Sequence, residues 1–160
     1  MDDQEAAGTA AAHAAEGRGF HTTLRVRWSD CDPAGIVFYP NYYAYFESAM
    51  MEFLQSRGAS WMSLMRSQGV HFPRVESHCT YMAPASYEDT VRVDLRLREA
   101  ARKVLTIGFT IGREPGRERI CEGHVKFAMA RIPTDGERAR ALELPDEIRQ
   151  LFDVLAGVDD

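Results

Sequence analysis

Residues 41–57 have the pattern of a long helix with very few polar positions. At 100° per residue, the polar side chains fall on one narrow stripe: Ser48, Glu52, Gln55 and Ser56. The opposite side is apolar and aromatic: Tyr43, Phe46, Met50, Phe53 and Leu54. A helix with so thin a polar stripe is largely enclosed by the rest of its protein. We therefore expect a fold that wraps around this helix, which Gly58 is suited to end.

The segments around this helix show the two-residue period of β-strands. Leu24, Val26 and Trp28 alternate with arginines, which predicts a strand with one buried face near the start of the domain. Valines and leucines alternate with charged residues in the same way over residues 91–98. Further strands are predicted at 70–82, 104–111 and 120–132, with a Glu-Pro-Gly-Arg turn at 114–117, and short helices at 61–68 and 144–155.

The order of these elements predicts an α+β fold. One strand, one long helix and then a run of antiparallel strands fit a single sheet curled around a central helix. A chain of 160 residues suits one domain, which we expect to span residues 20–156. Residues 1–19 are rich in alanine, glycine and acidic residues, and such a segment is expected to be a disordered tail because it has little to bury.

Composition and charge exclude several classes of protein. A formal net charge of −5 argues against a nucleic-acid-binding protein, which needs a basic surface. No apolar run approaches the roughly 18 residues that span a bilayer, so no membrane insertion is expected. Three cysteines without a secretory signal sequence argue against a disulfide scaffold and predict a soluble protein of the reducing cytoplasm.

The loop that leads into the helix carries the most informative motif. Residues 30–42 read Asp-Cys-Asp-Pro-Ala-Gly-Ile-Val-Phe-Tyr-Pro-Asn-Tyr. This segment resembles the signature of the 4-hydroxybenzoyl-CoA thioesterase family, and the order of elements agrees with that family over roughly residues 20–155. The motif is long and nearly contiguous, which makes it far more specific than a short glycine pattern.

The resemblance implies a fold, an assembly and two catalytic groups. Members of the family have the hotdog fold, in which an antiparallel sheet wraps around a central helix. They form homodimers or homotetramers with active sites between subunits. By the resemblance, Asp32 is the catalytic carboxylate that hydrolyses an acyl-CoA, and the backbone N–H of Tyr39 polarises the thioester carbonyl. The alternative from local sequence alone is that Asp30 and Asp32 are only turn residues.

Elementary chemistry supports such a site independently. A thiol has a pKa near 8.5, so a thiolate leaves with little help from a general acid. The site then needs one attacking group and donors for the oxyanion. A carboxylate can act as nucleophile or as base for water, and N–H groups at a helix start can hold the oxyanion. Pro33 and Gly35 allow the loop to turn so that Asp32 faces that helix end.

Other charged residues are further candidates. Glu47 lies off the polar stripe, among apolar residues, so its carboxylate must be partnered or protonated; the family often carries an acid here near the substrate pocket. The alternatives are a structural ion pair or a subunit contact. Arg102 and Lys103 match a basic pair that, in the resembled thioesterases, lies near the CoA phosphates. Their alternative is a solvated hairpin, and Arg92, Arg96 and Arg98 are expected on an exposed strand face.

The acyl pocket is expected beside the start of the helix. Aromatic residues that could line it are Trp28, Phe38, Tyr39 and Tyr42, with Phe72 contributed from another strand. By the resemblance, Pro40 is typical of the aryl-CoA branch, whereas the cell-envelope-associated acyl-CoA thioesterases tend to have histidine there. This favours an aryl group, of the 4-hydroxybenzoyl or benzoyl type, or a short acyl group. The alternative is that these rings belong only to the core.

Other chemistries find little support. The pairs His78-Cys79 and Cys121/His124 lack the spacing of a zinc site, so no metal or other cofactor is expected. Neither a Gly-x-Ser-x-Gly elbow nor a phosphate-binding glycine loop is present in the sequence. Two alternatives stay open. One is a hotdog hydroxyacyl dehydratase, which uses a histidine that this loop lacks, and the other is a non-catalytic acyl-CoA-binding protein.

Overall fold

A computed structural model describes residues 19–131, 133 and 136–157. The predicted tail lies outside the described residues except for Gly19. The described part contains three α-helices, one short 3-10 helix and seven strands. In chain order they are β1 (Phe20–Arg25), η1 (Trp28–Asp30), α1 (Asn41–Ser56), α2 (Trp61–Gln68), β2 (Val70–His71), β3 (Arg74–Tyr81), β4 (Thr90–Ala100), β5 (Val104–Glu114), β6 (Arg119–Arg131), β7 (Ala141–Leu142) and α3 (Asp146–Asp153).

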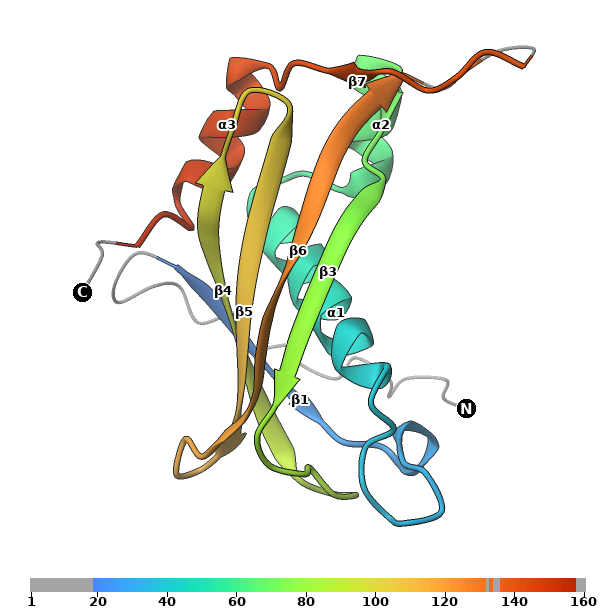
Figure 1. Ribbon diagram of the computed structural model, residues 1–160. Helices are drawn as coiled ribbons and strands as arrows, with labels where there is room; N and C mark the ends of the chain where they lie inside the picture. The colour runs from blue at the N-terminus through green and yellow to red at the C-terminus, as the bar shows by residue number, and fades with distance from the viewer. Residues whose placement is uncertain (1–18, 132, 134–135, 158–160) are drawn as a thin grey trace, which may run out of the picture.

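The strands form one antiparallel sheet. Its long strands lie in the order β1-β4-β5-β6-β3, and the two-residue strands β2 and β7 add to the end of β6. Helix α1 crosses one face of the sheet, and α2 and α3 lie near the end of the sheet where α1 ends (Figure 1). We call the face covered by α1 the inner face and the opposite one the outer face. The predicted layout, one sheet curled around one long helix, is therefore present.

Helix α1 has the predicted bounds but is less enclosed than expected. It ends at Ser56, and Gly58 takes the left-handed conformation (φ +69°) that stops helices. Its inner side is buried against the sheet through Phe46, Met50 and Leu54 among others. The opposite side is open in this chain, however, because Ala44, Met51 and Gln55 are exposed. The thin polar stripe indicated burial on almost all sides, and a single chain supplies only part of it.

The period-two pattern is confirmed in β4 but not in the segment 70–82. In β4 the side chains of Val91, Val93 and Leu95 are fully buried on the inner face. The segment 70–82 is two strands, β2 and β3, with Pro73 between them; proline has no N–H for a sheet ladder. The side chains of β3 are mostly exposed, because this strand is an edge of the sheet. Strand β7 and the 3-10 helix η1 were not predicted.

Trp28 is the clearest difference from the expected strands. The first strand ends at Arg25, and Val26 is the last buried residue of its alternating series. At Arg27 the backbone N–H donates to the Asp30 carboxylate (2.9 Å), and the chain turns into η1. Trp28 is therefore 74% exposed, with its ring edge against Tyr87 (5.6 Å between centroids). A local capping contact overrides the alternation here.

Most of the core lies between α1 and the inner face. Strand β5 contributes Ile107, Phe109 and Ile111 to this core. At one end of the core, Phe152 of α3 packs against Phe53 (5.6 Å between ring centroids). Within the described residues, no helix is both long and apolar enough to cross a membrane. The core thus fixes α1, and α1 in turn fixes the loop before it.

Candidate active site

Asp30 anchors the loop that precedes α1. Its carboxylate Oδ2 accepts hydrogen bonds from the Arg27 N–H (2.9 Å) and from the Tyr45 hydroxyl (2.9 Å). Its backbone carbonyl accepts from Asn41 Nδ2 (2.8 Å) and from the Phe38 N–H (2.9 Å). Burial, followed by the bond to Asp30, raises the pKa of the Tyr45 hydroxyl, which stays a donor. Asp30 therefore holds both ends of the loop against the first turns of α1.

Asp32 sits at the tip of this loop with part of its carboxylate unused. Oδ1 accepts a hydrogen bond from the Ala34 N–H (2.8 Å), as in an Asx turn. The Asp32 N–H donates to the Ile36 carbonyl, and the Asp32 carbonyl accepts from the Gly35 N–H (2.9 Å each). Gly35 has φ +79°, a conformation that glycine adopts without strain. Among the described residues, Oδ2 of the half-buried Asp32 has no hydrogen-bond donor. The turn fixes the side chain and leaves one oxygen open.

The start of α1 leaves a single backbone donor open. The N–H groups of Asn41 and Tyr43 donate to loop carbonyls at 2.9 and 3.0 Å, and Pro40 has none. Tyr42 donates more weakly to the Tyr39 carbonyl (3.4 Å). The Tyr39 N–H has no acceptor among the described residues. Most of the donors that a helix start could offer are thus occupied, and the donor that remains is the one singled out from the sequence.

Aromatic side chains gather around this donor. Phe38 and Tyr39 are both exposed, with ring centroids 5.2 Å apart, whereas Tyr42 is buried and its hydroxyl accepts the Ala85 N–H (3.2 Å). Tyr81, from the end of β3, was not singled out from the sequence. Its ring lies 6.2 Å from that of Tyr39 and 5.6 Å from that of Tyr42. Only the pairing of β3 with β6 brings Tyr81 here, so no local sequence signal could have found it.

Cys31 is the other nucleophilic side chain in the loop, but it is held as a thiol. Burial is the main cause that raises the pKa of its Sγ–H, and the neighbouring carboxylates of Asp30 and Asp32 add to the shift. The thiol donates to the Arg27 carbonyl at a sulfur–oxygen distance of 3.6 Å. Because the thiolate is the reactive form of cysteine, this environment disfavours Cys31 as a nucleophile. The carboxylate of Asp32 is therefore the better candidate.

Glu47 is partnered, as its apolar surroundings required. Both of its carboxylate oxygens accept hydrogen bonds from Arg74 of β3, at 3.0 and 2.8 Å. The Arg74 guanidinium also lies over the rings of Trp61 (5.2 Å) and Phe127 (4.9 Å). The pair is about two-thirds buried and connects α1 to the edge strand. This geometry is the structural ion pair that was weighed as the alternative, and a substrate role for Glu47 stays a prediction.

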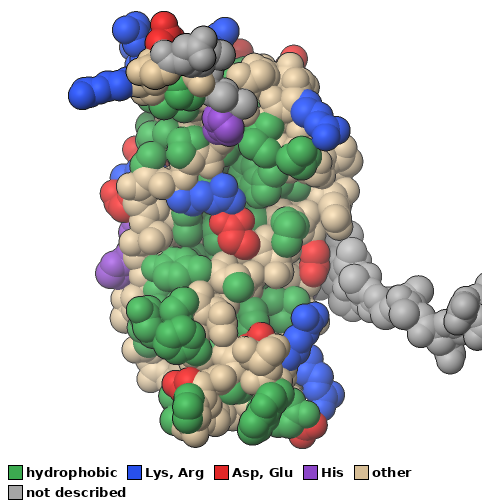
Figure 2. All heavy atoms as spheres, turned by 90° about the vertical axis from the view of Figure 1, so that its right-hand side faces the viewer, with side chains coloured by type: hydrophobic (Ala, Val, Ile, Leu, Met, Phe, Trp, Pro, Cys, Tyr) green, Lys and Arg blue, Asp and Glu red, His purple; other side chains and the backbone are tan. Residues whose placement is uncertain are grey.

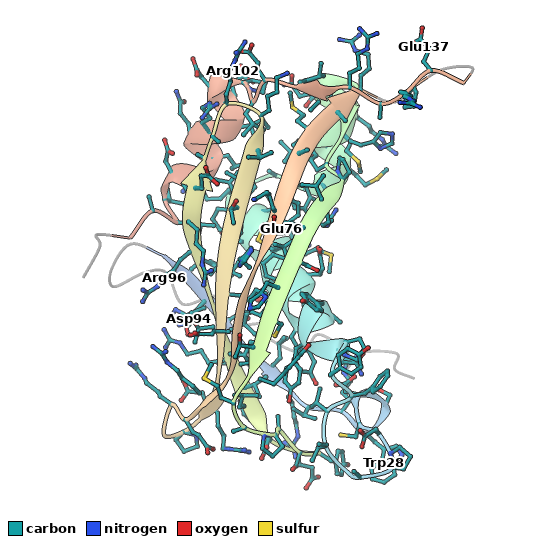
Figure 3. The ribbon with its side chains drawn as sticks, in the orientation of Figure 1. Trp28, Glu76, Asp94, Arg96, Arg102 and Glu137 are labelled. Atoms are coloured by element: carbon teal, nitrogen blue, oxygen red, sulfur yellow. The ribbon has the colours of Figure 1, made fainter. Side chains whose placement is uncertain are left out.

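The single chain does not bring the remaining predicted residues to this loop. Phe72 is buried against Trp61 (5.3 Å between ring centroids), near the end of α1 rather than its start. Arg102 and Lys103 form the exposed β4–β5 hairpin, where Arg102 pairs with Glu143. Figure 3 shows Arg102 and Trp28 at opposite ends of the molecule. If these residues meet the same substrate, the substrate must be extended or must bridge two subunits.

The described part of the chain contains no cluster of three or more His, Cys, Asp and Glu side chains that could hold a metal ion. The candidate site therefore consists of one partly unused carboxylate, one backbone N–H without an acceptor among the described residues, and a group of aromatic rings, all at the start of α1. A curled antiparallel sheet around a long helix, with an acid-bearing loop at the helix start, defines a hotdog-fold protein of the hydrolytic type.

Comparisons with known proteins identify the family. Residues 26–152 match the Thioesterase-like superfamily, so the chain belongs to that family. It is 33% identical to 4-hydroxybenzoyl-CoA thioesterase of Pseudomonas sp. strain CBS-3 over 135 residues, which cover 79% of this chain and 92% of that protein. It is 37% identical over 128 residues to a protein of Aquifex aeolicus, covering 80% and 93% of the two chains.

Solved structures agree with this assignment. The crystal structure of a 4-hydroxybenzoyl-CoA thioesterase mutant with bound 4-hydroxybenzoyl-CoA superposes with a TM-score of 0.74 at 28% identity, covering 84% of this chain and 99% of the other. A gentisyl-coenzyme A thioesterase gives a TM-score of 0.68 at 29% identity, with 81% and 98% covered. The resemblance found in residues 30–42 and the predicted hotdog fold are confirmed.

Proposed function

We propose that this protein hydrolyses an acyl-CoA thioester to the free acid and CoA, with Asp32 as the reacting carboxylate. The observation that carries the proposal is that one short loop holds two polar groups without a hydrogen-bond partner in the described part of the chain. Asp32 keeps one carboxylate oxygen without a donor, and the Tyr39 N–H has no acceptor among the described residues. The first can attack or activate water, and the second can receive the oxyanion.

Two routes are compatible with this arrangement. In the first, Asp32 Oδ2 attacks the thioester carbon, the thiolate of CoA leaves, and water then hydrolyses the resulting mixed anhydride. In the second, Asp32 takes a proton from water as the water attacks, and the same thiolate leaves. In both routes the Tyr39 N–H donates to the carbonyl oxygen as it gains charge, and removing such a donor costs roughly 3–4 kcal/mol.

For the acyl group, we propose an aryl group or another compact group. The exposed rings of Phe38, Tyr39 and Tyr81 lie beside the loop, and flat rings suit a flat acyl group through stacking or edge contacts. The 33% identical relative is a 4-hydroxybenzoyl-CoA thioesterase, which favours the same class of substrate. Glu47 and Phe72 would join such a pocket only where a second subunit brings them close.

We further propose that the protein is a homodimer or a homotetramer. The strand β3 pairs with β6 on one side, and no other described strand pairs with its opposite edge. Unpaired strand edges are liabilities that proteins cover. Hydrophobic side chains gather on the face that includes this edge and the open side of α1 (Figure 2). Exposed apolar side chains on the elements of this side are Met51 of α1, Met62 of α2 and Val75 and Tyr81 of β3, with Met82 directly after β3. Sedimentation velocity should show a dimer or a larger species, and a fully active monomer would contradict a site shared between subunits.

A panel of CoA esters tests the proposed activity. Thiol release should be catalytic for benzoyl- and 4-hydroxybenzoyl-CoA, and kcat/KM should fall steeply beyond about six to eight acyl carbons. One methylene that no longer fits costs about 1–3 kcal/mol. A protein that binds these esters without releasing thiol would be a non-catalytic binder, which would refute the proposal. A smooth rise of kcat/KM towards palmitoyl-CoA would refute the aryl assignment alone.

A further inference from the structure

The outer face of the sheet carries a trough whose floor is the central strand β5. In the antiparallel register, Arg96 lies opposite Gly108 and Arg92 lies opposite Gly112, with the Asp94–Thr110 pair between them. Neither glycine has a side chain, so little covers the backbone of β5 on the outer face. Long side chains from the neighbouring strands project on either side of it and form the walls of the trough. Figure 3 shows Asp94 and Arg96 projecting from β4 on the side away from α1.

The trough is a real hollow in the surface. Two adjoining cavities of about 440 and 290 Å³ lie along it and share Asp94, Arg96, Thr110 and Arg119 in their walls. Between Arg92 and Arg98 the trough runs about 20 Å, at roughly 3.3 Å per strand residue. One end is narrowed by Arg98, which lies across Gly108 so closely that a Cβ there would be 2.5 Å from its Nε. Glycine at 108 is thus required for this arrangement of the arginine.

Positive charge is concentrated in the trough although the chain is acidic. Its walls hold six arginines and three acids, in a chain whose net charge is −5. The acids are Asp94, Glu114 and Glu122, and the arginines are Arg92, Arg96, Arg98, Arg113, Arg117 and Arg119.

Ion pairs inside the trough neutralise two of the three acids. Asp94 accepts from Arg92 Nε and Nη2 (3.0 and 2.8 Å), and Glu122 pairs with Arg119 (3.2 Å). The guanidinium groups of Arg96 and Arg117 have no hydrogen-bond or ion-pair partner among the described residues. Arg98 donates to His124 Nδ1 (3.2 Å), which is not an acid. Arg113 is paired with Asp89 and with Glu118 (3.0 Å), two acids outside the trough walls. The unpaired positive charge therefore lies on Arg96, Arg98 and Arg117, against one acid of the walls, Glu114, without an ion-pair partner among the described residues.

We propose that this trough binds a small molecule that carries two or more phosphate groups, such as a nucleoside diphosphate. Guanidinium groups bind phosphate oxygens through paired hydrogen bonds, and several of them along one trough suit a ligand with several phosphates. The Thr110 hydroxyl on the floor can donate one more hydrogen bond. The trough lies on the opposite face of the sheet from α1 and Asp32, so the inference does not depend on the proposed hydrolysis.

Isothermal titration of the full-length protein with pyrophosphate, ADP and CoA tests the proposal. Pyrophosphate and ADP should bind the unaltered protein, and the double variant Arg96→Ala/Arg117→Ala should raise both dissociation constants at least tenfold. Arg57→Ala/Arg66→Ala is the matched control, because it removes two exposed helix-associated arginines away from the trough and should leave both constants unchanged. If CoA binding weakens only in the trough variant, the ligand is the nucleotide part of CoA; if CoA binding is unaffected, the ligand is a free nucleotide.

Two results would overturn the proposal. One is an unaltered protein that binds neither pyrophosphate nor ADP, and the other is equal binding by the trough variant and the control. Sedimentation of the same variants identifies the competing occupant, a second copy of the chain. A trough variant that changes its assembly while the unaltered protein binds no phosphate would assign the trough to a contact between copies.

Discussion

The start and the middle of α1 use their polar groups in opposite ways. At its start, the loop residues Asp32 and Tyr39 each retain one group without a hydrogen-bond partner among the described residues. At the middle of the helix, Arg74 uses Nε and Nη2 on Glu47 and Nη1 on the Phe72 carbonyl (3.1 Å). The rings there are packed closely, with Trp61 stacked on Phe127 at 5.5 Å between centroids.

This difference separates reactivity from stability. Unused polar groups at a rigid site are available to a substrate, whereas groups that are fully paired stabilise the fold and have nothing left to offer. Asp30, two residues from Asp32, is more heavily engaged: its Oδ2 accepts two hydrogen bonds and its backbone carbonyl accepts two more, so it acts mainly as an anchor of the loop. Substitutions in the packed region around Glu47 and Arg74 should therefore lower stability, and substitutions of the open groups should lower activity.

The largest expected effect on stability comes from Phe127 in the packed region, and exposed Phe38 at the start of α1 is its counterpart. Phe127→Ala empties a site that is 1% exposed and removes the ring beneath Arg74, so the free energy of unfolding should fall by about 3–5 kcal/mol. Phe38→Ala, at the open end, removes an exposed ring and should change it by about 0.5 kcal/mol or less. Urea denaturation measures both variants. An equal loss of unfolding free energy in the two would contradict the separation of a packed, stabilising region from an open, reactive one.

A medium effect is expected when Asp30 is removed. Asp30→Ala leaves the buried Tyr45 hydroxyl without its acceptor, which should cost about 1–3 kcal/mol of unfolding free energy. In the Asp30→Ala/Tyr45→Phe double variant, part of that loss should be recovered, because no orphaned hydroxyl remains. Denaturation of the two single variants and the double variant completes the cycle. Strictly additive losses would show that the Asp30–Tyr45 bond does not hold the loop.

The smallest expected effect concerns the hairpin residues Arg102 and Lys103. If they meet the phosphates of CoA, Arg102→Ala/Lys103→Ala should raise KM about three- to tenfold and leave kcat nearly unchanged, the signature of lost uniform binding. Stability should hardly change, because the Arg102–Glu143 pair is exposed. With a pantetheine thioester, which lacks the nucleotide, the defect should disappear. An equal defect with both thioesters would assign these residues another role.

The sequence predicted those parts of the molecule where local pattern and burial agree. The periodicity of apolar residues predicts α1 and β4, and the proline and glycine at 115 and 116 predict the turn between β5 and β6. The exposure of Trp28 was not predicted. The Asp30 carboxylate accepts a hydrogen bond from the Arg27 N–H, and this contact ends the strand alternation before Trp28. The break at Pro73 was also missed, since an exposed edge strand has little apolar pattern to read.

The candidate site divides in the same way. The roles of Asp32 and Tyr39 were inferred from one contiguous motif, and their partly unused groups lie on that same loop. Tyr81 could not be found, because it reaches the loop through the pairing of β3 with β6, far apart in sequence. Phe72 was expected at the start of α1, but the chain packs it on Trp61 near the other end. Such placements depend on tertiary contacts, which a local pattern does not contain.

The role of Asp32 as the reacting carboxylate is tested by Asp32→Asn, measured beside Asp30→Asn in the same assay. Asp32→Asn keeps the size of the side chain and an oxygen for the Ala34 N–H but removes the charge needed to attack or to accept a proton. We expect kcat for thiol release to fall at least about 100-fold, while the urea midpoint and CoA affinity stay nearly unchanged. Asp30→Asn should instead lower the midpoint and keep most of kcat. An Asp32→Asn protein with near-normal turnover would show that the Asp32 carboxylate is not the reacting group.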